Sequence, residues 1–72
     1  MSENAQRARR ARVALDAYRA QGGMSEDDCE AIVDLIVDLL HLGGTLGTGR
    51  AGGLADLAVL HYEAELAEGA AA

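Results

Sequence analysis

Between residues 25 and 46 the chain places single polar residues at helical spacing within long apolar stretches. The polar positions recur every three or four residues, so on a helix they would lie along one narrow stripe. They are Glu30, Asp34, Asp38 and His41. From residue 31 to 42 most other positions are isoleucine, valine or leucine, and a helix that is apolar over most of its circumference is normally buried from several sides. We therefore expect residues 25–46 to form the central helix, with Ser25 as its N-cap.

Two weaker helical patterns flank this segment. Over residues 3–21 the apolar positions lie three or four residues apart and would share one helical face. They are Ala8, Ala11, Leu15 and Tyr18. The stretch LADLAVLHYEAEL predicts a third helix over residues 53–68. We expect the tail at 69–72 to fray, because chain ends are seldom held by other contacts.

Glycine dominates the segment between the second and third predicted helices, with six glycines over residues 43–53. Within it, GTGRAG at residues 47–52 has the G-x-G-x-x-G spacing of a dinucleotide-binding loop. That loop works at the end of a β-strand within a βαβ unit, whereas here helices are expected on both sides. We therefore predict a flexible connector over 43–53, in which Gly47 ends the second helix and Thr48 is a candidate cap for the third.

The composition favours helices and limits how stable a single chain can be. The 72 residues are rich in alanine and leucine and contain no proline, tryptophan or phenylalanine. A domain of this size has little interior, and its single cysteine, Cys29, cannot form a disulfide within the chain. Because Cys29 lies among apolar helix positions, we expect a packed, inert thiol. We predict one all-α, three-helix domain over residues 1–72, in which a homodimer completes the burial of the apolar second helix.

Charge is divided unevenly along the chain. Residues 1–23 contain five arginines and two acidic residues, whereas residues 24–72 contain ten acidic residues and one arginine, for a net charge of −6. An acidic protein repels nucleic acid and is attracted to basic protein surfaces, so we expect a protein partner with a basic surface. The arginines of RARRAR are then expected to pair with acidic residues of this or another chain. No stretch is apolar and long enough to span a bilayer, and no signal peptide is visible, so we expect a cytoplasmic protein.

The spacing of aspartate, leucine and histidine resembles a known set of proteins. D-L-x-x-D-L-x-H at residues 34–41 and H-Y-x-A-E at residues 61–65 resemble small uncharacterised helical proteins of phages, prophages and plasmids. The resemblance covers residues 25–66 and departs in the loop, where GTGRAGG stands in place of a Gly-Leu-Asp helix start. It implies an accessory protein of a mobile element in a bacterial host, and it implies no particular activity.

The acidic half of the chain leads to a first hypothesis, an interaction protein that is not an enzyme and has neither catalytic residues nor a cofactor. Its carboxylates would stand in for nucleic-acid phosphates in a basic groove of a host defence complex, as an anti-CRISPR inhibitor does. The expected partner-binding residues are Glu30, Asp34, Asp38, Asp56, Glu63 and Glu65.

The alternative hypothesis is a metal-binding helical domain or a small metal-dependent hydrolase. Asp34, Asp38 and His41 are spaced i, i+4 and i+7, and His61 and Glu65 are spaced i and i+4. Carboxylates and imidazoles at such spacings can bind zinc or manganese. If the second and third helices form an antiparallel hairpin, His61 would meet the aspartate stripe. No HExxH motif and no pair of cysteines accompanies these residues, so the interaction protein is the preferred interpretation.

Overall fold

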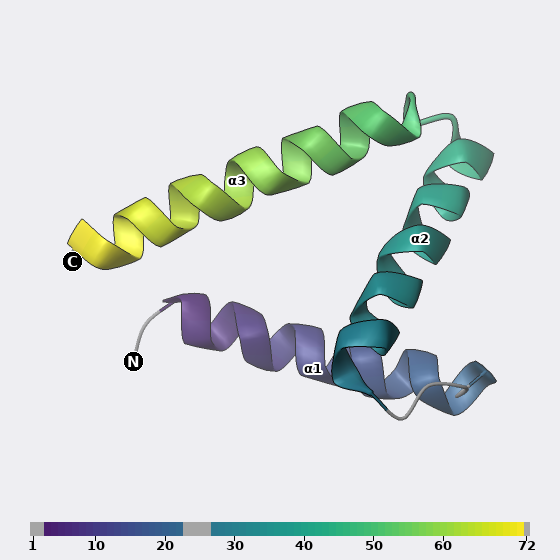
Figure 1. Cartoon of the computed structure of the whole chain (residues 1–72), viewed down its shortest axis with the longest axis horizontal. Coiled ribbons are helices and arrows are strands. Elements are labelled where there is room, and N and C mark those ends of the chain that lie inside the picture. Colours follow the sequence, from purple (N-terminus) through teal and green to yellow (C-terminus); the bar gives the residue numbers. More distant parts are fainter. Residues whose placement is uncertain (1–2, 23–26, 72) are drawn as a thin grey trace.

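The computed structural model describes residues 3–22 and 27–71, and these form three α-helices (Figure 1). α1 spans Glu3–Gly22, α2 spans Asp28–Leu46 and α3 spans Ala51–Ala71. The predicted all-α, three-helix fold is therefore confirmed. None of these helices is long and apolar enough to cross a membrane.

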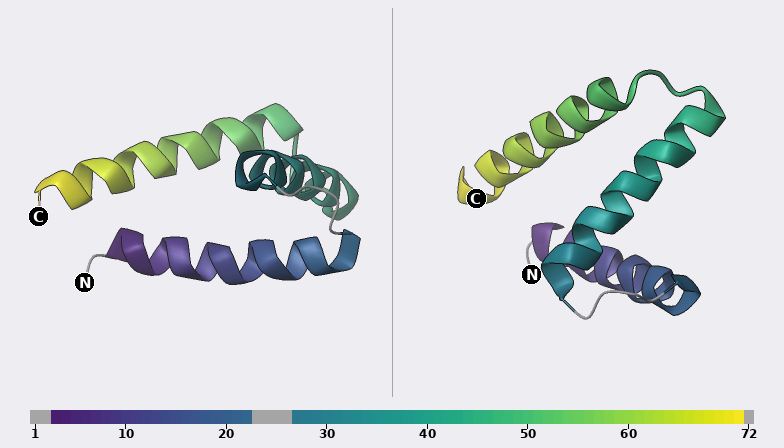
Figure 2. Two further views of the ribbon diagram at one scale, coloured as in Figure 1. Left: turned by 60° about the horizontal axis from the view of Figure 1, so that its bottom comes forward. Right: turned by 45° about the vertical axis from the view of Figure 1, so that its right-hand side comes forward.

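The helices form an open bundle with a triangular outline (Figures 1 and 2). α1 and α3 run in opposite directions, while α2 crosses α1 at one end and meets α3 at the other. The N-terminal end of α1 lies near the C-terminal end of α3, and there the Asn4 side-chain amide donates a hydrogen bond to the Glu65 carbonyl oxygen at 3.0 Å. The triangle is therefore closed by direct contact at all three corners.

The N-terminus of α2 lies three residues further along the chain than expected. Asp27 is the N-cap, and its carboxylate accepts a hydrogen bond from the Cys29 amide at 2.9 Å. An aspartate at this position satisfies a free amide and places negative charge at the positive end of the helix. The predicted cap, Ser25, lies outside the described residues. Cys29 is exposed, so the expectation of a packed thiol is wrong.

α2 ends as the sequence predicts. Gly47 has a left-handed backbone (φ 70°), and its amide donates to the Gly44 carbonyl oxygen. This is the conformation in which glycine commonly ends helices. Thr48 does not cap α3 as expected. Its hydroxyl and its amide both donate to the Gly43 carbonyl oxygen at 3.0 Å, so Thr48 instead satisfies the end of α2.

The connector between α2 and α3 is shorter than predicted. Only residues 47–50 lie outside the two helices, because Gly43 and Gly44 belong to α2 while Gly52 and Gly53 belong to the first turn of α3. α3 also continues to Ala71, past the predicted end at residue 68 and through most of the tail expected to fray. Alanine is the strongest helix former, which accounts for the extension.

Little of the chain is buried. Among the described residues the only buried apolar side chains are Leu15 of α1, 5% exposed, and Ala31 of α2, 2% exposed. The expectation that α2 is covered from several sides is not met within one chain, because seven of its large aliphatic side chains are 45–66% exposed. They are Ile32, Val33, Ile36, Val37, Leu39, Leu42 and Leu46.

Candidate functional site

The two aspartates of the predicted partner surface on α2 lie beside a tyrosine of α1. The Tyr18 hydroxyl donates a hydrogen bond to Asp38 Oδ2 at 2.5 Å. This bond, followed by partial burial and by the negative charges of Asp38 and Asp34, raises the pKa of Tyr18 to about 12. Both carboxylates remain exposed. Asp34 and Asp38 therefore present negative charge to solvent at the place where α1 crosses α2.

Glu65, another predicted partner-binding residue, takes part in the contact between α1 and α3. Its side chain lies 3.5 Å from the Arg7 guanidinium and is half-buried. Arg7 also donates a hydrogen bond to the Asn4 side-chain oxygen at 2.8 Å. Glu65 thus has a structural partner within the chain, and it is less accessible to a second protein than the other candidates.

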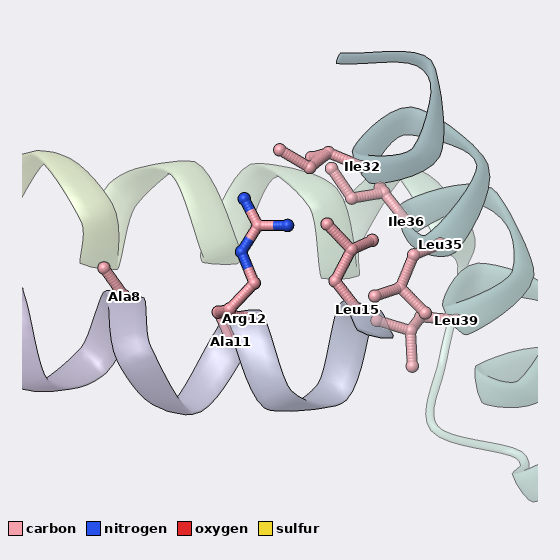
Figure 3. A pocket seen from close by; sticks show the side chains of 8 residues that line it. All are labelled: Ala8, Ala11, Arg12, Leu15, Ile32, Leu35, Ile36 and Leu39. Carbon is pink, nitrogen blue, oxygen red and sulfur yellow. The ribbon is translucent and has the colours of Figure 1, made fainter. Parts of the chain in front are cut away.

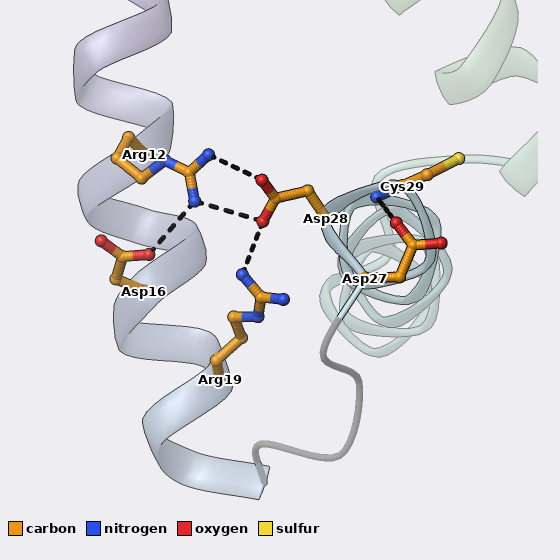
Figure 4. A network of polar contacts seen from close by, with 6 residues as sticks. All are labelled: Arg12, Asp16, Arg19, Asp27, Asp28 and Cys29. Carbon is orange, nitrogen blue, oxygen red and sulfur yellow. Dashed lines mark hydrogen bonds and ion pairs between the residues drawn. The ribbon is translucent and has the colours of Figure 1, made fainter.

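Two arginines of α1, Arg12 and Arg19, converge on the start of α2 (Figure 4). Asp28 lies 2.7 Å from Arg19 and 3.2 Å from Arg12, which also reaches Asp16 on its own helix at 3.5 Å. Hydrogen bonds from Arg12 and then Arg19 lower the pKa of Asp28 below its usual value, and the same contacts raise the pKa of Arg12. The sequence expectation that the basic segment pairs with the acidic half of the chain is confirmed at this point.

The remaining predicted partner-binding residues lie on exposed parts of α2 and α3. Glu30, Asp34, Asp56 and Glu63 are all exposed. Within residues 3–22 and 27–71, no ion pair involves Asp34, Asp56 or Glu63. Neither α2 nor α3 contains a lysine or an arginine, although each carries four acidic residues. In the described part of the chain, α1 supplies the arginines that pair with Asp28 of α2 and Glu65 of α3.

The structure does not assemble the alternative metal site. Asp34, Asp38, His41, His61 and Glu65 all lie within the described ranges, and in that part of the chain no three histidine, cysteine or acidic residues gather closely enough to hold a metal ion. The antiparallel hairpin that would have brought His61 to the stripe does not form, because α2 and α3 meet at the connector and then diverge (Figure 1). Both histidines are exposed on separate helices.

The GTGRAG segment has the geometry of a helix-to-helix connector. Gly47 and Gly49 adopt positive φ values of 70° and 109°, and α3 begins two residues after Gly49, at Ala51. A helix precedes the glycines, so the strand that a dinucleotide-binding loop requires is replaced by α2. The interpretation of this segment as a connector is confirmed.

An apolar groove between α1 and α2 is a surface feature that the sequence did not reveal (Figure 3). Its volume is about 380 Å³. The α1 side contributes Ala8, Ala11, Arg12 and Leu15, and the α2 side contributes Ile32, Leu35, Ile36 and Leu39. Three of these α1 residues belong to the predicted apolar face of that helix. The groove could not be foreseen because its shape depends on the angle at which the helices cross.

The pairing of Asp28 with Arg12 and Arg19 was also not predicted from the sequence, although the spacing of the two arginines gives an indication of it. Arg12 and Arg19 are seven residues apart and therefore lie on one side of a helix, two turns from each other. Two arginines on one face can share a single acidic partner. The sequence does not show which carboxylate takes that place.

Comparison of this chain with protein-family models, with curated proteins and with solved structures finds no match.

Proposed function

We propose that the protein acts by binding another protein, through the exposed carboxylates of α2 and α3, and that the partner presents a basic surface that otherwise binds nucleic acid. The observation that carries this proposal is the separation of charge. Asp34, Asp56 and Glu63 are exposed on helices without a basic residue, while three of the five arginines of α1, Arg7, Arg12 and Arg19, are directed to Glu65 and Asp28. A surface of this kind attracts a basic partner over several ångströms and repels nucleic acid.

The chemistry of the partner follows from what these carboxylates imitate. A nucleic-acid channel is lined with lysine and arginine. Their N–H groups can donate hydrogen bonds to carboxylates as they do to phosphates. The positively charged channel of a CRISPR effector is one such surface. Inhibition of a host defence complex of this type, in the manner of an anti-CRISPR, is the specific form of the proposal, and it agrees with the resemblance to proteins of mobile elements.

The experiment compares two variants with the same net charge. Replacing the three exposed carboxylates (D34N, D56N and E63Q together) changes the net charge from −6 to −3 by removing the proposed surface. The matched control adds three lysines at exposed alanines of α1 (A14K, A17K and A20K together) and also changes the charge from −6 to −3. Tagged proteins would be used to capture partners from a nuclease-treated bacterial lysate at low and at high salt.

The proposal expects the wild-type protein and the lysine control to retain a partner at low salt and release it at high salt. The carboxylate-depleted variant should retain little. The captured partner should then bind nucleic acid less well in a filter-binding assay when wild-type protein is added. Equal capture by the two charge-matched variants, or a partner whose nucleic-acid binding is unaffected, would show that the acidic surface is not the binding site.

A further inference from the structure

The single chain exposes far more surface than a compact protein of its mass. A folded monomer of this size exposes about 4,200 Å², whereas this chain of 7.5 kDa exposes 5709 Å². Its radius of gyration is 13.7 Å, compared with about 11 Å for a compact domain of the same length. The excess surface of about 1,500 Å² per chain falls in the range that permanent homodimers bury, about 1,000–2,500 Å² on each partner.

Much of the exposed surface is apolar. Among residues 3–22 and 27–71, thirteen large apolar side chains are between 45% and 70% exposed, and two apolar side chains are buried. A helix with an uncovered aliphatic face is stabilised mainly by packing against a partner. A partner that stabilises the fold must be present whenever the chain folds. A second copy of the same chain meets this condition, because copies of one protein are synthesised together.

The groove between α1 and α2 has the shape that a two-fold symmetric contact needs. On the α1 side, small side chains at Ala8 and Ala11 lie beside the larger Arg12 and Leu15, and the α2 side carries only large aliphatic side chains, including Ile32 and Ile36 (Figure 3). In a two-fold dimer, residue i of one copy meets residue j of the other, and j meets i. The isoleucines of each copy can therefore pack where the alanines of its partner leave room, which makes this part of the groove complementary to itself.

The charges around the groove agree with an apolar contact. Arg12 is the one charged residue among those that line the groove, and it is paired with Asp28 and Asp16. The groove thus offers no unpaired charge that would call for an acidic or basic occupant. The acidic carboxylates Asp56 and Glu63 belong to α3, which contributes no residue to the groove.

We propose that the α1–α2 groove is the interface of a homodimer in which two copies pack groove to groove about a two-fold axis, with the α2 isoleucines of each copy against the α1 alanines of the other. This dimer is independent of the acidic-surface proposal. Each chain carries a net charge of −6, so the two copies repel each other and added salt strengthens the dimer by screening that repulsion. Salt has the opposite effect on the binding of a basic partner.

The test is sedimentation equilibrium of the full chain, in reducing buffer because Cys29 is exposed, at low and at high salt. The wild-type protein should sediment at twice the chain mass of 7.5 kDa, with a dissociation constant that falls as salt rises. Ile36→Ala shortens a groove residue while favouring the helix, and it should raise the dissociation constant about tenfold or more. Val13→Ala makes a similar change at an exposed α1 residue that does not line the groove. It should change the dissociation constant by no more than about twofold.

A second measurement covers the case in which Ile36→Ala loses its helical structure. A photoreactive benzophenone amino acid placed at Leu39, in the groove, should give a covalent dimer on irradiation of the purified protein, whereas the same group at Val13 should not. A wild-type protein that sediments at one chain mass at every concentration would overturn the proposal. So would equal effects of the two alanine variants, or cross-linking from Val13 alone. Because purified protein is used, failure here leaves the acidic-surface proposal standing.

Discussion

The two ends of α2 are attached to their neighbours by different chemistry. From its first residue, Asp28, to its middle at Asp38, α2 is attached to α1 by side chains: Arg12 and Arg19 pair with Asp28, the Tyr18 hydroxyl donates to Asp38, and Leu15 is buried. At the C-terminal end, α3 is held by backbone geometry and close approach. There a Cβ on Gly43 would lie 2.6 Å from Leu54 Cδ1, so the first turn of α3 sits directly against the backbone of α2.

This difference has consequences for how each junction responds to solution conditions. Charged and hydroxyl groups change their contribution with pH and salt, because protonation or screening weakens their contacts. A glycine contact depends on shape alone and has no titratable part. The α1–α2 junction should therefore loosen at extremes of pH while the α2–α3 corner stays closed, and the predictions below separate the two.

The largest effect is expected from Leu15→Ala. Leu15 is one of the two buried apolar side chains in the described structure, and it lies between α1 and the aliphatic residues of α2 (Figure 3). Removing a buried leucine side chain costs about 2–5 kcal/mol. Urea unfolding followed by circular dichroism at one fixed protein concentration should show a loss of this size, or no folded protein at all. Val13→Ala, at 70% exposure, should change the free energy of unfolding by less than about 0.5 kcal/mol.

Amide hydrogen exchange would show which part of the molecule Leu15→Ala destabilises. If the two junctions are separable, Leu15→Ala should accelerate exchange in α1 and the first half of α2 more than between Gly43 and Leu54. Uniform acceleration along the whole chain would show that the two junctions open together. They would then not differ in their free energies of opening.

A matched pair of glycine variants tests the other corner. Gly43→Leu places a side chain where Leu54 and Thr48 already stand, whereas Gly44→Leu meets nothing within 4 Å. Both substitutions gain about 0.8–1 kcal/mol of helix propensity, so the difference between them reports the steric conflict. Overpacking costs about 1–3 kcal/mol, and we expect Gly43→Leu to be less stable than Gly44→Leu by that amount in urea unfolding. Equal stabilities would mean that Leu54 moves aside without cost.

Much of the fold follows from local sequence signals. The period of apolar residues predicted three helices, and Gly47 was identified as the end of α2 because a left-handed residue there favours glycine. The sequence predicts Ser25 as the cap of α2, whereas the cap is Asp27, because serine and aspartate are both favoured at this position and a local pattern does not choose between them. The predicted connector over 43–53 overlaps the predicted second helix over 25–46, and the overlapping residues belong to the helix, where Gly43 makes a close contact with Leu54.

The candidate site was less predictable because it depends on how the helices cross. Partners such as Arg12 and Asp28, sixteen residues apart, or Tyr18 and Asp38, twenty apart, share no local pattern. The predicted metal ligands are not brought together in the described structure for the same reason, since the spacing of Asp34 and Asp38 on one helix follows from the sequence while the position of His61 relative to them does not. Helix faces can be predicted from sequence, whereas the crossing angle that joins two faces comes from packing.

The Tyr18 hydroxyl offers a direct probe of the α1–α2 junction at high pH. Its folded-state pKa of about 12 lies above the ordinary value of 10.0, so the neutral hydroxyl stabilises the fold below pH 10, and this contribution is lost as the pH rises towards 12. In a Tyr62→Phe background, tyrosinate absorbance should report Tyr18 alone. Asp38→Asn should shift its titration towards 10, because the hydrogen bond to Asp38 is the main cause of the raised pKa.

Asp34→Asn is the control for that experiment, since Asp34 affects Tyr18 only through charge. It should lower the Tyr18 pKa by less than Asp38→Asn does. The readings are meaningful while the helical circular dichroism signal persists. A Tyr18 that titrates near 10 in the parent protein would mean that the contact between α1 and α2 is open in solution.

The smallest effect is expected from Asp28→Asn, because exposed ion pairs contribute little to stability in water. The pKa of Asp28 in the folded protein is lowered from 3.8 by Arg12 and then Arg19. Its contribution is therefore present above pH 3.8 and is lost as the pH falls through the lower folded-state value. Unfolding free energies measured from about pH 7 to about pH 2 should fall less steeply in Asp28→Asn than in the parent, while Asp56→Asn, which has no ion pair in the described structure, should keep the parent slope. The protection of amides near Gly43 from hydrogen exchange should not decrease as acid loosens the contact between α1 and α2. If it does, acid weakens both ends of α2 together, and the charged junction is no more sensitive to pH than the glycine corner.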